Sequence, residues 1–336
     1  MLMDSWGRQI TYLRISVTDR CNLRCVYCIP PVGFEWKAKD EILSYKEITR
    51  FVTVAAGLGI RYVRLTGGEP LVRPDLPILI SALSAIPGIE ELSLTTNGTL
   101  LEKLAKPLAE AGLRRVNISL DTLDAEKFRR ITRGGDIEQV WRGIAAADAV
   151  GFHPIKINSV IVRGLNSDEL IPLADLTRKH PWHIRFIELM PIGNLEDWGA
   201  DFLSLHDRYL SVGEMKDILS ALDLQPTKVP PGNGPAKTYK IPGGLGAIGF
   251  ISPLGEPFCS SCNRLRLTAD GCLRSCLMSN QEISIREAIR QGDPLEPLIR
   301  RAVAQKPEGH HLSSSAFSTP PSVELTSARF MTQIGG

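Results

Sequence analysis

The sequence predicts an α/β protein: an incomplete (β/α)6 TIM-type barrel with a C-terminal extension that carries a second cysteine cluster site. Two observations predict this fold class. Six short β-rich runs alternate with helical stretches, which is typical of parallel βα units, and several runs are polar on one face only. The expected strands are 10–17, 61–66, 91–97, 115–121, 155–162 and 183–189.

The segments between the strands carry helix start and stop signals. Ser44 and Glu47 form a capping-box pattern before an amphipathic run. Gly112 and Gly151 follow two further amphipathic runs. Glycine is favoured directly after a helix because it adopts the left-handed conformation at little cost, so we expect helices to end there.

One face of the expected strands is polar, because successive side chains of a strand point to opposite sides. The residues on this face are Tyr12, Arg14, Ser16 and Thr18, then Arg64 and Thr66, then Ser93, Thr95 and Asn97, then Asn117, Ser119 and Asp121, then Lys156 and Asn158. A complete barrel fills its interior with Val, Ile and Leu, and a sheet covered on both faces is apolar throughout. The pattern therefore favours a polar-lined cleft inside a partial barrel. A two-layer α/β sheet with one wetted face is the alternative.

The length of 336 residues suggests about two domains. After about residue 190 the sequence becomes rich in turn residues, and a Pro- and Gly-rich stretch occupies 230–235. We expect a barrel domain over 1–229 and a second region over 230–336, with an irregular polar segment at 307–322.

Composition excludes several classes of protein. The formal net charge is +2, which disfavours polybasic nucleic-acid or membrane-surface binding. No apolar run reaches about 18 residues and no apolar signal core follows the N-terminus, so we expect a cytoplasmic protein. Seven cysteines are an odd number without a secretion signal, which favours metal or thiol chemistry over structural disulfides.

The first cysteine group follows the first expected strand. Cys21, Cys25 and Cys28 have C-x3-C-x2-C spacing, at the strand end where α/β proteins bind ligands. Three thiolates can hold three irons of a cubane cluster and leave the fourth iron open to the amino and carboxylate groups of a small molecule. Zinc with a remote fourth ligand is the alternative.

The second cysteine group lies in the C-terminal region. Cys259 and Cys262 form C-x2-C, and Cys272 and Cys276 follow within 18 residues. Four thiolates at this spacing also fit a zinc ribbon, so a zinc-ribbon nucleic-acid-binding protein is one alternative function. Arg264 and Arg266 lie between the two pairs and share a face if their segment is extended.

Several motifs in one order resemble the radical S-adenosylmethionine superfamily and, within it, the GTP 3′,8-cyclase family of molybdenum-cofactor biosynthesis. They are LRISVTDRCNLRCVYC, RLTGGEPLVR, LTTNG and VNISLD, and the similarity runs from about residue 8 to Gly336. The resemblance implies conversion of GTP to (8S)-3′,8-cyclo-7,8-dihydroguanosine 5′-triphosphate by way of a 5′-deoxyadenosyl radical. Another radical S-adenosylmethionine enzyme with an auxiliary iron–sulfur cluster, such as a peptide maturase, is the second alternative.

The resemblance also implies cofactors and their ligands. Two [4Fe–4S] clusters are expected, one on Cys21, Cys25 and Cys28 and one on Cys259, Cys262 and Cys276. The open iron of the first cluster would chelate S-adenosylmethionine, and the open iron of the second would contact the purine. The positions for S-adenosylmethionine are Tyr27, Gly68, Ser119 and Met190. Cys272 departs from the family pattern, because it is an additional thiol that would close the open iron if it were a ligand.

Substrate positions follow from the same resemblance. Those for GTP are Arg14, Arg64, Thr95, Lys156, Arg264, Leu265 and Arg266, and the catalytic residues among them are Arg14, Arg264 and Arg266. Tyr62 stands where many relatives carry Lys, so one phosphate contact is expected to be missing. The final Gly335 and Gly336 are expected to enter the active site, because residues without a Cβ fit a crowded cleft.

The implied partners are GTP, an electron donor of flavodoxin or ferredoxin type, and the next pathway enzyme, cyclic pyranopterin monophosphate synthase. A homodimer is compatible with the resemblance. Neither nucleic acid nor a membrane is an expected partner.

Overall fold

The computed structural model describes residues 1–192, 198, 202–227, 234–310, 312 and 329–335. Residues 12–188 contain six strands, each at a position that the sequence predicts. They are β1 (Tyr12–Ser16), β2 (Tyr62–Thr66), β3 (Glu91–Thr96), β4 (Arg115–Ser119), β5 (Lys156–Ile161) and β6 (His183–Glu188). The rest of the chain adds β7 (Gln225–Pro226), β8 (Lys237–Lys240), β9 (Ala247–Ile251), β10 (Arg264–Leu267), β11 (Cys272–Arg274) and β12 (Ile283–Ser284).

Helices follow the strands in the expected βα alternation. Those of the barrel are α1 (Tyr45–Leu58), α2 (Leu76–Ser84), α3 (Leu101–Glu110), α4 (Ala125–Thr132), α5 (Ile137–Ala149) and α6 (Leu170–Lys179). Those after the barrel are α7 (Leu205–Arg208), α8 (Val212–Ile218), α9 (Arg286–Gln291), α10 (Glu296–Ala304) and α11 (Met331–Ile334). Short 3₁₀ turns are η1 (Pro70–Val72), η2 (Ser167–Glu169), η3 (Ser220–Leu222) and η4 (Cys259–Ser261).

The strands form one open sheet in the order β12-β11-β10-β1-β2-β3-β4-β5-β6-β9-β8-β7. Strands β1 to β6 lie side by side in chain order and pair in parallel. The C-terminal region extends this arc at both edges, since β10 pairs in parallel with β1 and β9 with β6. The prediction of an incomplete α/β barrel with a C-terminal extension is confirmed.

The helix boundaries agree with the sequence signals. The Ser44 side chain accepts a hydrogen bond from the Glu47 backbone N–H, and the Glu47 side chain accepts one from the Ser44 backbone N–H. Helices α3 and α5 end just before Gly112 (φ 104°) and Gly151 (φ 80°). Only glycine adopts such backbone angles readily, which explains why both helices stop there.

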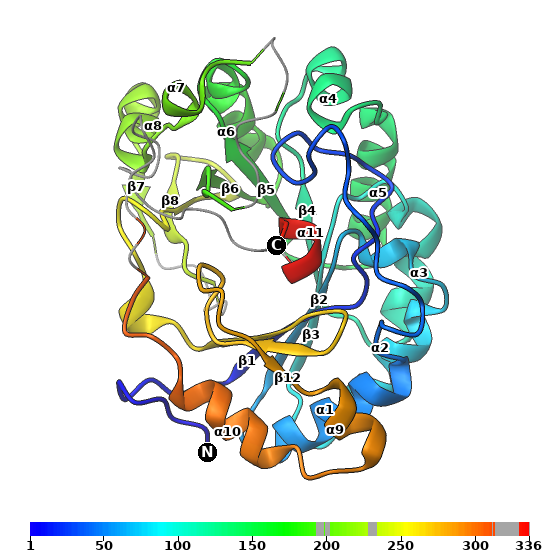
Figure 1. The fold of residues 1–336 in the computed structure, drawn as a ribbon. Coiled ribbons are helices and arrows are strands. Elements are labelled where there is room, and N and C mark those ends of the chain that lie inside the picture. The colour runs from blue at the N-terminus through cyan, green and yellow to red at the C-terminus, as the bar shows by residue number, and fades with distance from the viewer. Residues whose placement is uncertain (193–197, 199–201, 228–233, 311, 313–328, 336) are drawn as a thin grey trace.

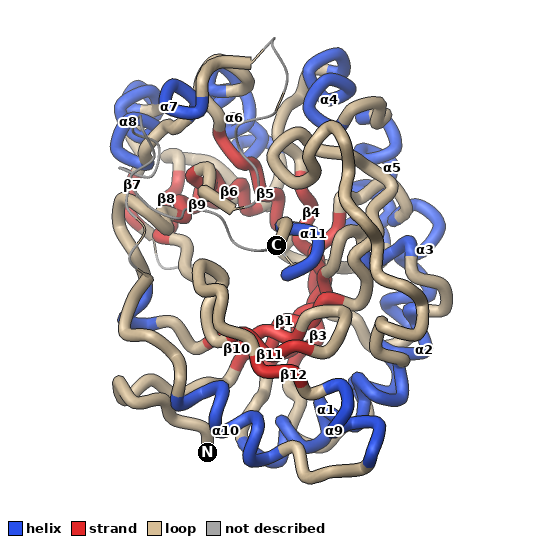
Figure 2. The backbone as a smooth tube through the Cα atoms, in the orientation of Figure 1, coloured by secondary structure: helices blue, strands red, loops and turns tan. Residues whose placement is uncertain are grey.

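Helices α1 to α6 cover the outer face of the arc, and the short α11 lies inside it (Figures 1 and 2). Apolar strand residues such as Leu13, Ile15 and Val63 are completely buried in the main core. The alternate residues, including Arg14 and Arg64, therefore point to the inner face. Among the described helices, none is long and apolar enough to cross a membrane.

Two expectations lie wholly or largely outside the described residues. The domain boundary at 229/230 falls within the stretch 228–233, and most of 307–322 is likewise not described. Both stay predictions.

Candidate active site

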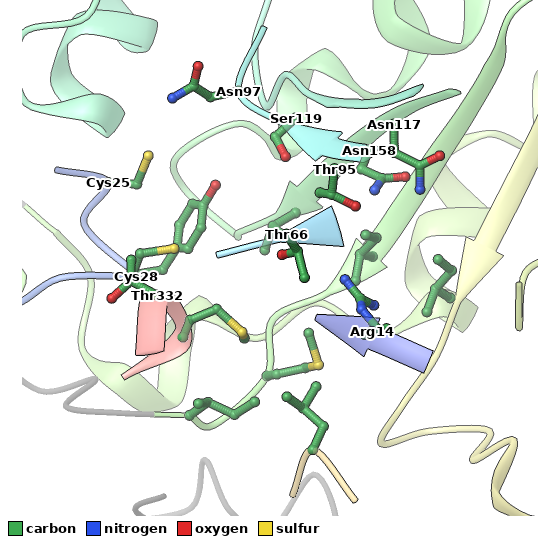
Figure 3. Close-up of a pocket in the computed structure, with 18 of the residues that line it drawn as sticks. Arg14, Cys25, Cys28, Thr66, Thr95, Asn97, Asn117, Ser119, Asn158 and Thr332 are labelled. Carbon is green, nitrogen blue, oxygen red and sulfur yellow. The ribbon is translucent and has the colours of Figure 1, made fainter. Parts of the chain in front are cut away.

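A cavity opens on the inner face of the arc, and successive strands contribute its polar wall (Figure 3). The strand residues on this wall are Arg14, Arg64, Thr66, Thr95, Asn117, Ser119, Asn158, Arg185, Arg264 and Arg266. Neighbouring strands are in register, so that Arg14 lies beside Arg64 on one side and beside Arg266 on the other. Most of the polar face expected from strand alternation thus lines one cavity, whereas Ser16, Thr18, Ser93 and Lys156 are not on its wall.

The first cysteine group forms one end of this cavity. Cys21, Cys25 and Cys28 all line it and all are free thiols. The loop is tightly turned, since the Cys28 backbone N–H donates to the Cys25 carbonyl at 2.9 Å. It is also held against the end of α4 by a hydrogen bond from the Val26 N–H to the Ile131 carbonyl at 2.9 Å.

The donor set of this loop, which consists of three free thiols, fits an iron–sulfur cubane. No group of three or more His, Cys, Asp or Glu residues in the described part of the chain converges on one ion site. A structural zinc ion needs its ligands within about 2.3 Å of one centre, whereas each thiolate on a cubane binds a different iron. Three thiols at one end of a cavity can meet the second requirement.

The four positions expected to bind S-adenosylmethionine all line the cavity. They are Tyr27, Gly68, Ser119 and Met190. The Tyr27 hydroxyl donates to Asp121 Oδ2, and burial raises the pKa of Asp121 to about 6. A Cβ at Gly68 would lie 2.3 Å from the Arg20 carbonyl oxygen, so glycine is required for the loop that carries Cys21 to pack on this strand end.

Arginines crowd the rest of the cavity wall. Arg185 and Arg266 are buried, at 8% and 4% exposure. Burial, followed by the positive charge of Arg64, lowers the pKa of Arg185 to about 9, and burial followed by Arg264 lowers that of Arg266 to about 10. Within the described ranges, no carboxylate forms a salt bridge with Arg64, Arg185 or Arg264. Grouped cations without matching acids favour an anionic ligand.

Three polar side chains on the cavity wall also have buried atoms that lack hydrogen-bond partners within the described part of the chain. The Thr95 hydroxyl, the Asn117 amide and the Asn158 Oδ1 have no hydrogen-bond partner among the residues that the structure describes. Buried polar atoms are nearly always satisfied in folded proteins. These three side chains point into the cavity (Figure 3), where a polar ligand would satisfy them.

Lys156 does not line the main cavity, although the resemblance groups it with the other residues expected to bind GTP. It lines a second cavity with Arg115 and His183, and Arg185 borders both spaces. The strand register explains this position: Lys156 begins β5, two residues before Asn158, and so lies deeper in the arc. Burial, then the charges of Arg185 and other cations, lower its pKa to about 6.

Leu265 differs from its two neighbours on β10. It is completely buried in the apolar core, on the face opposite to Arg264 and Arg266, and its side chain is not on the cavity wall. Only its backbone is available for the expected substrate contact. Tyr62 begins β2, in register with Tyr12 and Glu91, and likewise does not line the main cavity.

The second cysteine group lies next to the cavity wall that Arg264 and Arg266 help to form. Cys259 is in η4, Cys262 directly follows it and Cys276 follows β11. Their neighbours Phe258, Arg264 and Leu277 line the cavity, whereas the three thiols themselves do not. Lys306 connects the two segments, since its Nζ donates to the Arg264 carbonyl at 3.0 Å and to the Ser275 carbonyl at 2.7 Å.

Cys272 has a different environment from Cys276. Its Sγ accepts a hydrogen bond from Arg329 Nη2 at 3.5 Å, and burial, followed by Asp270 and Glu282, raises its pKa to about 11. These contacts place Cys272 among carboxylates and an arginine that the sequence did not connect with it.

The sequence reasoning missed Arg185, Asp121 in its contact with Tyr27, and Lys306. Arg185 carried a usable signal, because it occupies the same alternating position in the sixth strand as Arg64 does in the second. Asp121 was assigned to the polar face of the fourth strand. Its hydrogen bond with Tyr27 could not be predicted, because the two residues are 94 positions apart in the chain. Lys306 had no signal, because its contacts are with segments about 30 and 42 residues earlier in the chain.

Comparisons with known proteins agree with these motifs. A family model for the radical SAM superfamily matches residues 15–177, and one for Molybdenum Cofactor Synthesis C matches residues 182–312. A GTP 3′,8-cyclase from Moorella thermoacetica is 49% identical over 339 residues, and one from Pelotomaculum thermopropionicum is 47% identical over 340 residues, each covering 100% of both chains.

Among solved structures, Streptococcus suis SuiB bound to S-adenosylmethionine superimposes with a TM-score of 0.62 at 17% identity. The match covers 87% of this chain and 68% of SuiB, and it shows a shared fold. The full-length relatives are much more similar in sequence. On their identity and coverage, the chain belongs to the GTP 3′,8-cyclase family of the radical S-adenosylmethionine superfamily.

Proposed function

We propose that this chain binds S-adenosylmethionine and GTP in the cavity described above and cyclises GTP to (8S)-3′,8-cyclo-7,8-dihydroguanosine 5′-triphosphate, the first step of molybdenum-cofactor biosynthesis. One observation carries the proposal: a single cavity has three thiols at one end and a group of arginines along the rest of its wall. Two unlike ligands, one held at an iron–sulfur centre and one anionic, fit these two ends.

Membership in the radical S-adenosylmethionine superfamily implies S-adenosylmethionine and a [4Fe–4S] cluster. In this chain Cys21, Cys25 and Cys28 would hold that cluster. When bound, the cluster and S-adenosylmethionine supply a 5′-deoxyadenosyl radical that removes hydrogen from the substrate. Ser119 and Met190 line the same cavity, where the hydroxyl would bond the ribose and the thioether would pack on the adenine.

The chain's own residues would orient the substrate. Guanidinium groups bind phosphate through two parallel N–H donors, so the wall of Arg14, Arg64 and Arg185 suits a triphosphate, with Lys156 available beyond Arg185. Thr95, Asn117 and Asn158 offer unsatisfied donors and acceptors to ribose or base. Arg264 and Arg266 would place positive charge beside the reacting nucleoside. This charge would stabilise negative charge that develops there during the reaction.

A second [4Fe–4S] cluster would be held by Cys259, Cys262 and Cys276. The position of Cys272 beside Arg329 supports three ligands rather than four, which leaves one iron open to the purine. The barrel over 1–229 and the auxiliary region over 230–336 would thus each supply one cluster.

Reductive cleavage of S-adenosylmethionine consumes an electron, so a flavodoxin- or ferredoxin-type donor is part of the proposal. The product would pass to cyclic pyranopterin monophosphate synthase. We also propose that the protein forms a homodimer and is located in the cytoplasm.

The test is anaerobic reconstitution of the protein, followed by incubation with GTP, S-adenosylmethionine and a reductant, with product identified by mass spectrometry. Binding of the two ligands is then compared in Arg64→Gln. We expect GTP affinity to fall about 10- to 100-fold, because a charged hydrogen-bond donor is lost, and S-adenosylmethionine affinity to stay near the wild-type value.

Arg142→Gln is the matched control, since Arg142 pairs with Glu102 at 3.0 Å on the exposed outer surface. Cyclised product absent from the wild-type reaction, or equal loss of both affinities in Arg64→Gln, would contradict the proposal.

A further inference from the structure

The C-terminal segment 329–335 enters the cavity and completes its wall. Helix α11 lies inside the arc of strands (Figure 1), and Met331 and Thr332 line the cavity. The Gly335 carbonyl accepts a hydrogen bond from Arg266 Nη1 at 2.6 Å. Gly335 has φ 75°, and a Cβ there would lie 2.9 Å from the Thr66 Cγ2, so only glycine fits this close approach.

Arg329 holds the start of the same segment. Its Nη1 donates to both carboxylate oxygens of Asp270, at 2.9 and 2.8 Å, and its Nη2 donates to Glu282 Oε2 at 2.7 Å. All three side chains are largely buried, with exposed fractions of 17%, 10% and 19%. Glu282 is shared with Arg274, which is almost completely buried. A guanidinium removed from this group would leave buried carboxylate charge without compensation.

These contacts connect both ends of the segment to one hairpin. Asp270 lies in the turn between β10 and β11, and Glu282 directly precedes β12, which pairs with β11. Arg266, which holds Gly335, is on β10. The hairpin therefore contacts Arg329 at its turn and Gly335 at its strand, and the distance between these contacts sets how far the segment reaches into the cavity.

A third contact lies between the two ends. The Phe330 ring stacks on Phe34, with ring centroids 5.0 Å apart and an interplanar angle of 22°. Phe34 follows Cys28 by six residues. The segment therefore also contacts the chain that follows the first cysteine group. Both matching family models end before this segment, at residues 177 and 312.

We propose that Arg329 is a positioning residue for the reaction: its ion pairs with Asp270 and Glu282 fix the C-terminal segment so that Gly335 holds the Arg266 guanidinium in the cavity. This proposal rests on the proposed function, because that function supplies the reaction in which Arg266 takes part. The anchoring contacts themselves are independent of the substrate's identity.

Cys272 supplies a reporter of the anchor. Its Sγ lies 3.5 Å from Arg329 Nη2, and it is the one cysteine that the proposed cluster assignments leave as a free thiol. When Arg329 is docked, its guanidinium covers this thiol. When the segment is released, the thiol becomes accessible to an alkylating reagent.

The experiment compares reconstituted holoenzyme carrying Arg329→Gln with the wild type. Two quantities are measured: the ratio of cyclised product to S-adenosylmethionine cleaved, and the rate at which iodoacetamide alkylates Cys272, mapped by peptide mass spectrometry. We expect the product ratio to fall by about 10²-fold, since a small displacement of a catalytic group has effects of that size, while S-adenosylmethionine cleavage continues. Alkylation of Cys272 should become severalfold faster.

Arg300→Gln is the matched control, since Arg300 forms a half-exposed ion pair with Glu296 in the same C-terminal region and should behave as wild type in both assays. Asp270→Asn should reproduce the Arg329→Gln phenotype, and the double variant should be no worse than either single variant, because both remove the same interaction. Arg329→Lys, which keeps the charge, should restore part of the coupling.

Unchanged product ratio in Arg329→Gln overturns the proposal, whether or not Cys272 becomes accessible. Additive losses in the double variant overturn it as well, because they would mean separate roles for the two residues. Alkylation of Cys272 is informative even if the wild type yields no cyclised GTP, so a failure of the proposed reaction is distinguishable from a failure of the anchor.

Discussion

Cys21, Cys25 and Cys28 lie on one loop beside buried carboxyl groups, whereas Cys259, Cys262 and Cys276 come from two segments beside buried cations. Burial and, among nearby charges, Glu69 raise the pKa of Cys21 to about 11. Burial, then Cys21 and Asp121, raise that of Cys28 further. The negative surroundings of the first site suit a positively charged ligand.

The second site shows the opposite balance. Burial tends to raise the pKa of Cys262, but Lys306 and Arg264 outweigh it and the pKa is lowered overall. The pKa of Cys262 is therefore shifted in the opposite direction from those of Cys21 and Cys28. S-adenosylmethionine carries a sulfonium and an ammonium, and GTP carries about four negative charges. On the proposed function, we expect the positively charged ligand at the first site and the anionic one toward the second.

The largest effect should come from removing the first site completely. Replacement of Cys21, Cys25 and Cys28 by Ala should abolish S-adenosylmethionine cleavage and leave about half of the iron, because the proposed second cluster would have its own ligands. Iron and sulfide analysis with a 5′-deoxyadenosine assay measures both. Complete loss of iron from a folded chain would mean that the two groups share one cluster.

The second prediction separates two thiols of the C-terminal group. Cys276→Ser should lose the second cluster and product formation, whereas Cys272→Ser should keep both, because the Cys272 thiol faces Arg329. Iron, zinc and sulfide contents of the two variants, alongside product yield, provide the measurement. Matched losses would restore the four-thiolate arrangement.

The third prediction concerns the cation beside the second site. Lys306→Met removes the bridge between the Arg264 and Ser275 carbonyls and the charge near Cys262. We expect the second cluster to be held about 10- to 100-fold more weakly, as for other residues that orient metal ligands, with the first cluster unaffected.

Iron release to a chelator, followed for each cluster by electron paramagnetic resonance, tests this expectation. Lys103→Met on the exposed surface of α3 is the control. Equal retention of the second cluster in both variants would show that Lys306 has no role there.

The smallest effect concerns Lys156, which lines the second cavity beyond Arg185. Its pKa is lowered to about 6, so the amine of the free protein is mostly neutral at pH 8. Phosphate nearby would raise this pKa, because negative charge favours the ammonium. GTP binding at pH 8 should then take up as much as about one proton, and affinity should decline as pH rises through the pKa of the bound state.

Titration calorimetry at pH 8, in two buffers of different ionisation enthalpy, measures the uptake. Lys156→Met should remove it. A heat of binding that is independent of the buffer in the wild type would place Lys156 away from the phosphates.

Strand positions, helix ends and the face on which each strand residue lies followed from the sequence. Arg14, Arg64, Thr95, Asn117 and Asn158 could all be assigned to the inner face, because alternation along a strand is set by local backbone geometry. The cysteine spacing was equally local, and so was the requirement for glycine after α3 and α5.

The tertiary structure decided which of these residues meet. Arg264 and Arg266 join Arg14 only because β10 pairs with β1 across some 250 residues of chain. The register of β5 puts Lys156 two residues deeper than Asn158, and Cys272 on β11 contacts Arg329, which lies 57 residues later in the chain. Local geometry fixes the direction of a side chain, but long-range packing selects its neighbours, and the chemistry of this cavity depends on the neighbours.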